Sequence, residues 1–251
     1  DLYEALPQEA VPEFSNGDSL GLYPVNFAFQ PIVNPISKLV TSAEALLRGP
    51  NNESPSTILS QYSGIDLYRF DLESKQYALQ IAADMGLPCR VSVNLLPMSL
   101  IMIPDAVDFL LDKIESLGLS SEQIIVEITE EEAITNHDAF HGAVTRLRAA
   151  GIKVAIDDFG AGFAGLSLLA EFQPDKLKID RKLIQGIQTN GPKQAIVRAV
   201  IECCYSLGIS VIAEGVEDAA EVNWLLEAGV SKFQGFYFAR PSFNGFPQIN
   251  W

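Results

Sequence analysis

Short apolar runs alternate with longer amphipathic stretches along most of the chain. The apolar runs are rich in Val and Ile and have the length of strands that are buried on both faces. They predict strands at Phe27–Val33, Val40–Leu47, Arg90–Leu96, Ile124–Thr129, Lys153–Phe159, Lys176–Asp180, Ser210–Gly215 and Lys232–Phe238. The stretches between them have a helical period and predict helices at Asp66–Met85, Pro104–Leu117, His137–Ala150, Lys182–Leu207 and Asp218–Ala228.

Eight strands interleaved with helices favour a closed α/β barrel, and 251 residues is a common length for such a barrel as one domain. Only residues 34–39 separate the first two strands, which is too short for a parallel crossover. We therefore expect a modified TIM (β/α)8 barrel whose first strand is antiparallel. The barrel domain should cover residues 23–251. Residues 1–22 should be a polar linker from a longer protein, because the sequence begins with neither a start Met nor a signal peptide.

Composition narrows the class of ligand. The formal charge of −15 disfavours binding to long nucleic acid, which normally needs a basic face. It leaves room for a small phosphate-containing ligand, because a bound divalent cation reverses the local field. No apolar run reaches the roughly 18–20 residues that span a bilayer, so we expect no membrane contact. The three cysteines fit neither a disulfide framework nor a zinc knuckle, which favours a reducing cytoplasm.

Polar residues gather near the carboxyl ends of the predicted strands. They are Glu44, Asn94, Glu127, Asp157, Asp158, Lys178, Asp180, Glu214 and Gln234. Because these strand ends meet at one mouth of a barrel, we expect the side chains to converge. One buried carboxylate is compatible with a structural ion pair, but five or more at one mouth repel each other unless cations compensate them. All-oxygen ligands favour Mg²⁺ or Mn²⁺, and paired ions about 4 Å apart suit in-line displacement at phosphorus.

Three further signals each have an ordinary explanation beside a functional one. His137 and His141 lie one helical turn apart, which more often marks an exposed helix face than a metal site. Gly160-Ala161-Gly162 is either a turn or a phosphate cradle. Lys178 is either a solvated lysine or, on a buried strand that faces an acidic mouth, a group that orients or deprotonates an attacking water.

Together these residues resemble the EAL family of cyclic diguanylate (c-di-GMP) phosphodiesterases, from about Phe27 to Pro241. Each motif is short, but eight of them occur in the family's order. They are Phe29-Gln30-Pro31-Ile32-Val33, Glu44-Ala45-Leu46-Leu47-Arg48-Gly49, Ser92-Val93-Asn94-Leu95, Glu127-Ile128-Thr129-Glu130, Asp157-Asp158-Phe159-Gly160-Ala161-Gly162, Lys178-Ile179-Asp180, Ala213-Glu214-Gly215-Val216-Glu217 and Gln234-Gly235.

The resemblance implies an activity and a set of roles. The family folds as a modified barrel with an antiparallel strand. It hydrolyses c-di-GMP to linear 5′-pGpG by in-line attack of a metal-activated water, with two Mg²⁺ or Mn²⁺ ions when substrate is bound. Carried over by position, the metal ligands are Glu44, Asn94, Glu127, Asp157, Asp158, Glu214 and Glu217. The catalytic residues are Lys178, Glu214 and Glu130, of which Glu130 steadies the loop after Asp158 or is otherwise a surface charge. The substrate-binding residues are Gln30, Leu46, Arg48, Asp180 and Gln234.

Two positions depart from the family's pattern. Ala161 stands where a threonine is common, so a hydroxyl contact is missing and altered loop dynamics are expected. The sequence after Arg48, beginning Gly49-Pro50-Asn51-Asn52, does not follow the usual wording, so substrate affinity or regulation is expected to differ.

Several interpretations stay open at this point. A catalytically weak EAL domain that acts as a c-di-GMP receptor or protein-interaction module is the main alternative. A barrel metalloenzyme with another substrate would explain the carboxylates but not the matching Gln30, Leu46 and Arg48. The family also implies a sensory or partner domain before Asp1 and a homodimer in which Phe163-Ala164-Gly165-Leu166 takes part. That apolar segment is otherwise expected to pack on its own barrel.

Overall fold

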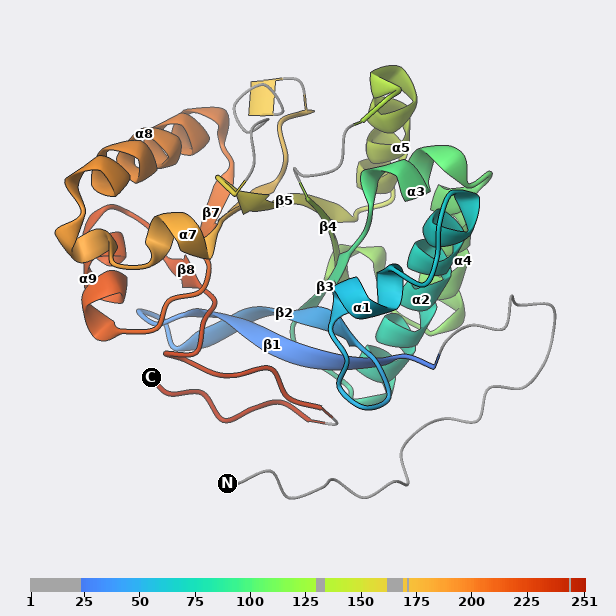
Figure 1. Ribbon diagram of the computed structural model, residues 1–251, viewed down its shortest axis with the longest axis horizontal. Coiled ribbons are helices and arrows are strands. Elements are labelled where there is room, and N and C mark those ends of the chain that lie inside the picture. Colours follow the sequence, from blue (N-terminus) through green and yellow to red (C-terminus); the bar gives the residue numbers. More distant parts are fainter. Residues whose placement is uncertain (1–23, 130–133, 162–168, 171, 244) are drawn as a thin grey trace.

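The computed structural model describes residues 24–129, 134–161, 169–170, 172–243 and 245–251. Eight strands close into one barrel in sequence order, with helices around its outside (Figure 1). The strands are β1 (Asn26–Asn34), β2 (Leu39–Arg48), β3 (Arg90–Asn94), β4 (Ile124–Thr129), β5 (Lys153–Phe159), β6 (Lys176–Ile179), β7 (Ser210–Ala213) and β8 (Lys232–Phe233). The predicted closed α/β barrel is confirmed.

Helices connect most successive strands and cover the barrel wall (Figure 1). The α-helices are α1 (Pro55–Leu59), α2 (Ile65–Asp84), α3 (Pro97–Met102), α4 (Ala106–Ser116), α5 (His137–Ala149), α7 (Arg181–Ile184), α8 (Gly191–Leu207) and α9 (Ala219–Glu227). The described residues also contain two short 3₁₀ turns, η1 (Ser121–Gln123) and η2 (Ile187–Thr189). Apolar side chains from both strands and helices form a continuous buried core between the barrel and this outer layer.

The predicted reversal of the first strand is also confirmed. β1 runs antiparallel to β2, with Phe29 opposite Ala45, and antiparallel to β8, with Val33 opposite Phe233. All other neighbouring strands are parallel. Nearly every residue of β1 is buried, as expected of a barrel strand that the outer layer also covers. The six parallel pairings bring the carboxyl ends of β2 to β8 to one mouth.

Two predicted elements are shorter than the sequence pattern suggested. The predicted helix at Lys182–Leu207 is broken into α7, η2 and α8. Gly186 adopts a left-handed conformation with φ of 72°, and the Asn190 side chain accepts a hydrogen bond from the Lys193 amide to cap α8. The predicted strand at Lys232–Phe238 ends at Phe233, because the chain turns where Gly235 packs closely against the Val216 backbone.

The end of the chain replaces the missing part of β8. The backbone of Ser242 exchanges two hydrogen bonds with Phe29, at N···O distances of 2.8 and 3.0 Å. The Gln30 side-chain amide also donates to the Ala239 carbonyl at 3.0 Å. This segment runs beside β1 in Figure 1 and satisfies the edge of β1 that two-residue β8 leaves unpaired.

Some predictions fall on residues that the structure does not describe. These are the polar segment at the start of the chain, Glu130 and the apolar segment at Phe163–Leu166, so the linker, the loop-steadying role and the homodimer stay predictions. Among the described residues, no helix is long and apolar enough to cross a membrane. His137 and His141 are both exposed on α5, which confirms that they mark a helix surface.

Candidate active site

The mouth of the barrel opens into a pocket of about 490 Å³. Most predicted site residues line it: Gln30, Glu44, Leu46, Asn94, Asp157, Asp158, Asp180, Glu214, Glu217 and Gln234. They come from both ends of the sequence and from seven strands or their following loops, which only the closed barrel brings together. The volume lies within the roughly 300–1,000 Å³ that is usual for small-molecule sites.

Asp157 and Asp158 both line the pocket because β5 is irregular where it ends. The β5–β6 register shifts between Ile156 and Phe159, and Asp158 adopts a left-handed conformation with φ of 55°. Neighbouring residues of a regular strand would point to opposite faces. The Asp158 amide donates to Oδ1 of Asp157 at 2.9 Å, which fixes the turn. The strand end therefore presents two carboxylates to one mouth, as predicted.

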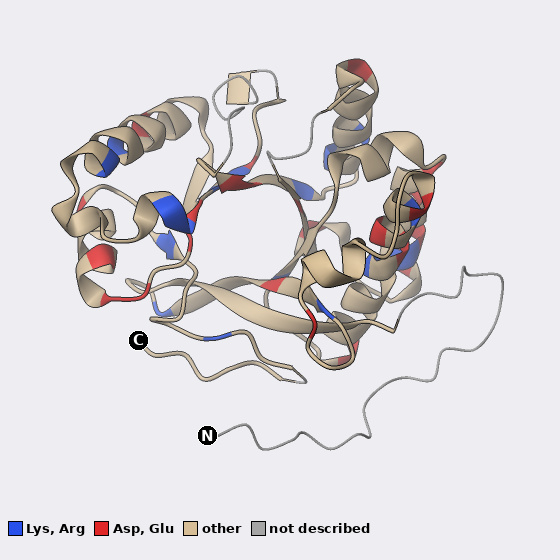
Figure 2. Cartoon of the chain, viewed as in Figure 1, with Lys and Arg blue, Asp and Glu red and all other residues tan. Residues whose placement is uncertain are grey.

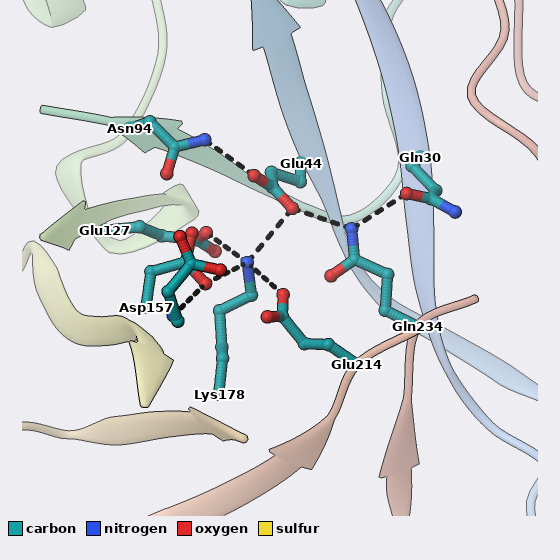
Figure 3. Close-up of polar contacts among 9 residues, drawn as sticks. Gln30, Glu44, Asn94, Glu127, Asp157, Lys178, Glu214 and Gln234 are labelled. Carbon is teal, nitrogen blue, oxygen red and sulfur yellow. Dashed lines mark hydrogen bonds and ion pairs between the residues drawn. The ribbon is translucent and has the colours of Figure 1, made fainter. Parts of the chain in front are cut away.

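Lys178 lies at the centre of the carboxylates (Figure 3). Its side chain is fully buried, and Nζ forms ion pairs with Glu44 Oε2 at 3.0 Å and Glu127 Oε2 at 2.5 Å. It also pairs with Asp157 Oδ1 at 3.0 Å and Glu214 Oε1 at 2.6 Å. Four buried or nearly buried acids thus share one ammonium, so the cluster keeps an excess of negative charge. The solvated interpretation of Lys178 is wrong.

The excess of carboxylates over ammonium groups shifts the pKa values of Lys178 and of the acids around it. Burial alone would lower the pKa of Lys178, but the surrounding carboxylates, Asp157 foremost, raise it well above 10.5. Burial raises the pKa of Glu127 to about 8, and Glu44 and Asp157 add to the rise against the opposing ammonium. Burial and Asp157 likewise raise the pKa of Glu214 well above its usual value. Without bound cations, Glu127 therefore holds a proton near neutral pH.

Glu44 behaves differently because hydrogen-bond donors surround it. Burial would raise its pKa, but Lys178, Gln234 and Asn94 together lower the pKa below its usual value. The Gln234 amide donates to Glu44 Oε2 at 2.7 Å, and the Asn94 amide donates to Oε1 at 2.6 Å. Gln234 also donates to Oε1 of Gln30 at 3.2 Å, which links β1 to the cluster (Figure 3). Glu44 is therefore the carboxylate that stays ionised most easily.

The arrangement fits two divalent cations. Glu44, Glu127 and Asp157 have carboxylate oxygens within 4.8 Å of one another, and so do Asp157, Asp158 and Glu214. Asp157 belongs to both groups. The Asn94 Oδ1 atom is buried without a hydrogen-bond partner, beside the first group through its contact with Glu44. A buried acceptor oxygen next to surplus carboxylates is what a hard cation such as Mg²⁺ or Mn²⁺ requires of its ligands.

Comparison with known proteins decides the family. A model of the EAL domain matches residues 24–241. The chain belongs to the EAL domain family. The blue light- and temperature-regulated antirepressor BluF of Escherichia coli K12 is 48% identical over 239 residues, covering 93% of this chain and 59% of BluF. The cyclic di-GMP phosphodiesterase PdeR of the same organism is 35% identical over 160 residues, covering 63% of this chain and 24% of PdeR.

Solved structures agree with this assignment. BlrP1 of Klebsiella pneumoniae, in complex with calcium and cyclic diGMP, matches with a TM-score of 0.87 and 46% identity, covering 97% of this chain and 64% of that one. A BlrP1 complex with manganese and cyclic diGMP matches with a TM-score of 0.87 and 49% identity, covering 92% of this chain and 59% of that one. The chain thus spans about three-fifths of the length of BluF and BlrP1.

Not every predicted residue of this EAL domain joins the central cluster. The Glu217 carboxylate pairs with Arg181 at 2.8 Å, and Arg48 donates to the Leu47 carbonyl at 2.7 Å. The Asp180 side chain accepts from the Lys182 amide at 3.0 Å and so caps α7 at the pocket edge. These three residues surround the acids of the cluster rather than adding to them.

Sequence reasoning missed a buried ion pair at the α1–α2 end of the pocket of this EAL domain. Asp71 and Lys75 both line the pocket, and Lys75 Nζ donates to Asp71 Oδ1 at 2.8 Å. Oδ2 of Asp71 accepts from the Leu96 amide at 2.8 Å and from the Ser99 hydroxyl at 2.7 Å. In the sequence, this pair looks like an i,i+4 pair on a solvated helix face. Only the structure shows that the ion pair is buried and that its Asp71 anchors the loop after β3.

Proposed function

We propose that this chain hydrolyses one phosphodiester bond of c-di-GMP to give linear 5′-pGpG, with the help of two Mg²⁺ or Mn²⁺ ions. The proposal rests on two clusters of three acidic residues each, which lie at the mouth of the barrel and share Asp157. Two adjoining cation sites are a recurrent solution for displacement at phosphorus. PdeR and the BlrP1 complexes support the substrate, because their names record activity on, or binding of, this dinucleotide.

We assign the ligands of the two ions and the role of Lys178 from their places in the cluster. Glu44, Asn94, Glu127 and Asp157 would hold one ion, and Asp157, Asp158 and Glu214 would hold the other. Bound ions would supply positive charge to the phosphoryl group and would lower the pKa of the attacking water. Lys178, whose Nζ lies among these carboxylates, would orient or help to deprotonate the attacking water.

The remaining pocket residues would position the dinucleotide. Leu46 would offer an apolar contact, and Gln30 and Gln234 are held in one hydrogen-bonded chain with Glu44. Oε1 of Gln234 is buried without a partner and remains available as an acceptor. Arg48 and Asp180 would act at the rim. Glu217 would support the second ion through water rather than bind it directly, because Arg181 pairs with its carboxylate.

A turnover assay tests this proposal. The protein is incubated with c-di-GMP and Mg²⁺ or Mn²⁺, and linear product is separated by chromatography. Asp157→Asn removes the charge that both carboxylate groups share, so it should abolish turnover while the fold persists by circular dichroism. Glu227→Gln, an exposed acid on α9, is the matched control and should not change the rate. Near-normal turnover by Asp157→Asn would show that the metal assignment is wrong.

The antirepressor BluF favours a second candidate function, because it is 48% identical and its name describes control of a partner protein. In that case the domain would bind c-di-GMP and signal by its shape. Binding in calorimetry without linear product would support this receptor function. If the protein neither binds c-di-GMP nor forms linear product, both candidate functions are overturned. A cytoplasmic location belongs to the same proposal and is supported by the free thiols of Cys89, Cys203 and Cys204.

A further inference from the structure

Basic residues begin several strands at the end of the barrel opposite the carboxylates. The first residue of β3 is Arg90, of β6 Lys176 and of β8 Lys232. In a parallel barrel, first residues of strands lie at the amino-terminal face, away from the mouth. Figure 2 shows acidic and basic residues on the strands that ring the barrel. The barrel therefore carries cations at one end and an excess of carboxylates at the other.

These basic residues occupy inward-facing positions. Side chains two apart on a strand lie on the same face. Lys176 lies two residues before the buried Lys178, and Arg90 lies four before Asn94. Lys232 lies two before Gln234, and its Nζ donates to the hydroxyl of Ser210, the first residue of β7, at 2.7 Å. Lys176 and Lys232 thus lie at the amino-terminal end of the barrel interior. Arg90 is exposed at the rim of this end, and its Nε donates to the Glu122 carbonyl at 3.0 Å.

The wall of this region is small and polar. Ser42 and Ser92 each lie two residues before a mouth residue on their strands, and Ala155 lies two before Asp157. Barrel interiors are normally filled at such levels by branched residues such as Val, Ile and Leu. The hydroxyls of Ser42 and Ser92 are fully buried and have no hydrogen-bond partner among the described residues. Two donors are therefore left without an acceptor inside the barrel.

None of these three basic residues forms an ion pair with a carboxylate of the described part of the chain. Lys176 is only 7% exposed, and no carboxylate of the described residues lies within ion-pairing distance of it. Burial lowers the pKa of Lys176 to about 8. Lys232 and Arg90 contribute to the fall, while Glu127 and Asp175 oppose it. Burial also lowers the pKa of Lys232, again with a contribution from Arg90. Lys176 therefore has no ion-pair partner among the described residues, although an unpaired buried charge destabilises a fold.

We propose that the amino-terminal end of the barrel interior binds a small oxyanion of the size of inorganic phosphate. Lys176, Lys232 and Arg90 would supply charge-assisted donors, and Ser42 and Ser92 would supply neutral ones. This site stands apart from the mouth and needs neither a divalent cation nor c-di-GMP. The opposing explanation is that the cations serve only to solvate and stabilise the barrel floor, as residues on this face often do.

Inorganic phosphate is the probe that separates these explanations. The protein is stripped of divalent ions with EDTA at pH 7, and phosphate is titrated by calorimetry and by thermal denaturation against sodium chloride of equal ionic strength. We expect saturable binding and a rise in the melting temperature that chloride does not reproduce. A chloride response equal to the phosphate response, or no saturable binding, would overturn the proposal.

Substitutions then place the anion. Lys176→Met and Lys232→Met should each weaken phosphate binding at least tenfold, whereas Lys113→Met on the outer helix α4 should leave it unchanged. Lys176→Met should also melt at a higher temperature than the parent in phosphate-free buffer, because it removes an unpaired buried charge. Arg48→Met, at the mouth, should bind phosphate as the parent does. Loss of binding in Arg48→Met, or parental affinity in both lysine variants, would place the anion elsewhere and refute the site.

Discussion

Glu127→Gln offers a sharp test of the electrostatics at the mouth. Glu127 is 1% exposed and shares the ammonium of Lys178 with three other acids. Gln has the same shape, keeps an oxygen that accepts from Lys178 and has no charge. Its amide nitrogen can also donate to the unpartnered Oδ1 of Asn94, which lies opposite Glu127 in the β3–β4 register. We therefore predict that Glu127→Gln stabilises the metal-free protein at alkaline pH while it weakens metal binding.

The magnitude follows from the pKa of Glu127, which burial raises from 4.5 to about 8. An acid with a higher pKa in the folded state binds more protons folded than unfolded between those two values. Stability therefore falls as the pH rises through this window. Each pKa unit corresponds to about 1.4 kcal/mol. The free energy of unfolding therefore falls by about 5 kcal/mol in total once the pH reaches 8 and above. This is an upper limit for the gain in Glu127→Gln, because neighbouring acids exchange protons with Glu127.

Urea and thermal denaturation at pH 5 and pH 8.5, in EDTA and in Mg²⁺, measure the effect. In EDTA, the advantage of Glu127→Gln should be small at pH 5. At pH 8.5, an advantage of several kcal/mol would raise the melting temperature by roughly 2–4 °C per kcal/mol. Mg²⁺ should reverse the order, because ligand binding stabilises only the protein that binds it. The reasoning is refuted if Glu127→Gln is the less stable protein in EDTA at pH 8.5. The exposed control Glu227→Gln should show neither effect.

Three other substitutions test single features. Lys178→Ala should lower turnover far more than c-di-GMP binding measured by calorimetry, and equal losses would make Lys178 a binding residue instead. Asp71→Ala should reduce the free energy of unfolding by about 3–5 kcal/mol because it leaves Lys75 buried and unpaired, whereas Asp108→Ala, from an exposed ion pair, should lose under about 1 kcal/mol. Asp158→Gly should be more stable than Asp158→Ala by about 1 kcal/mol, because Gly adopts positive φ without strain; the opposite order in urea denaturation would contradict the assigned conformation.

The barrel was predictable because its evidence is repeated along the chain. Each strand is a short apolar run, and the six residues at 34–39 leave no room for a parallel crossover. Boundaries were less predictable where backbone conformation overrides periodicity. The pattern of residues 182–207 continues through Gly186, but in the fold α7 ends at Ile184, where Gln185 becomes extended and Gly186 adopts a left-handed conformation. The end of β8 depends on the close approach of Gly235 to Val216, a contact between separate turns that no local pattern contains.

The candidate site was predictable as a set of carboxylates, because strand ends converge whatever their exact geometry. The partners of each residue were not. Arg48 donates to a neighbouring carbonyl and Glu217 pairs with Arg181, and neither partner could be read from the motifs, while their predicted roles toward phosphate and metal stay predictions. Asp71 and Lys75 were missed because the sequence does not indicate which face of α2 the loop after β3 covers. Such contacts depend on side-chain packing between elements, which spacing along one element cannot reveal.

Lys176 and Lys178 show most clearly why residue type alone could not assign the chemistry. They lie two residues apart on β6 and share its inward face. Burial lowers the pKa of Lys176 to about 8, while four carboxylates raise that of Lys178 well above 10.5 against the same effect of burial. The carboxylates around Lys178 come from β2, β4, β5 and the end of β7, and the cations near Lys176 come from β3 and β8. A displacement of two residues along β6, about 7 Å, thus separates the surplus of carboxylates at the mouth from the cations around Lys176. The closed barrel creates this contrast, because it alone brings these strands around a single axis.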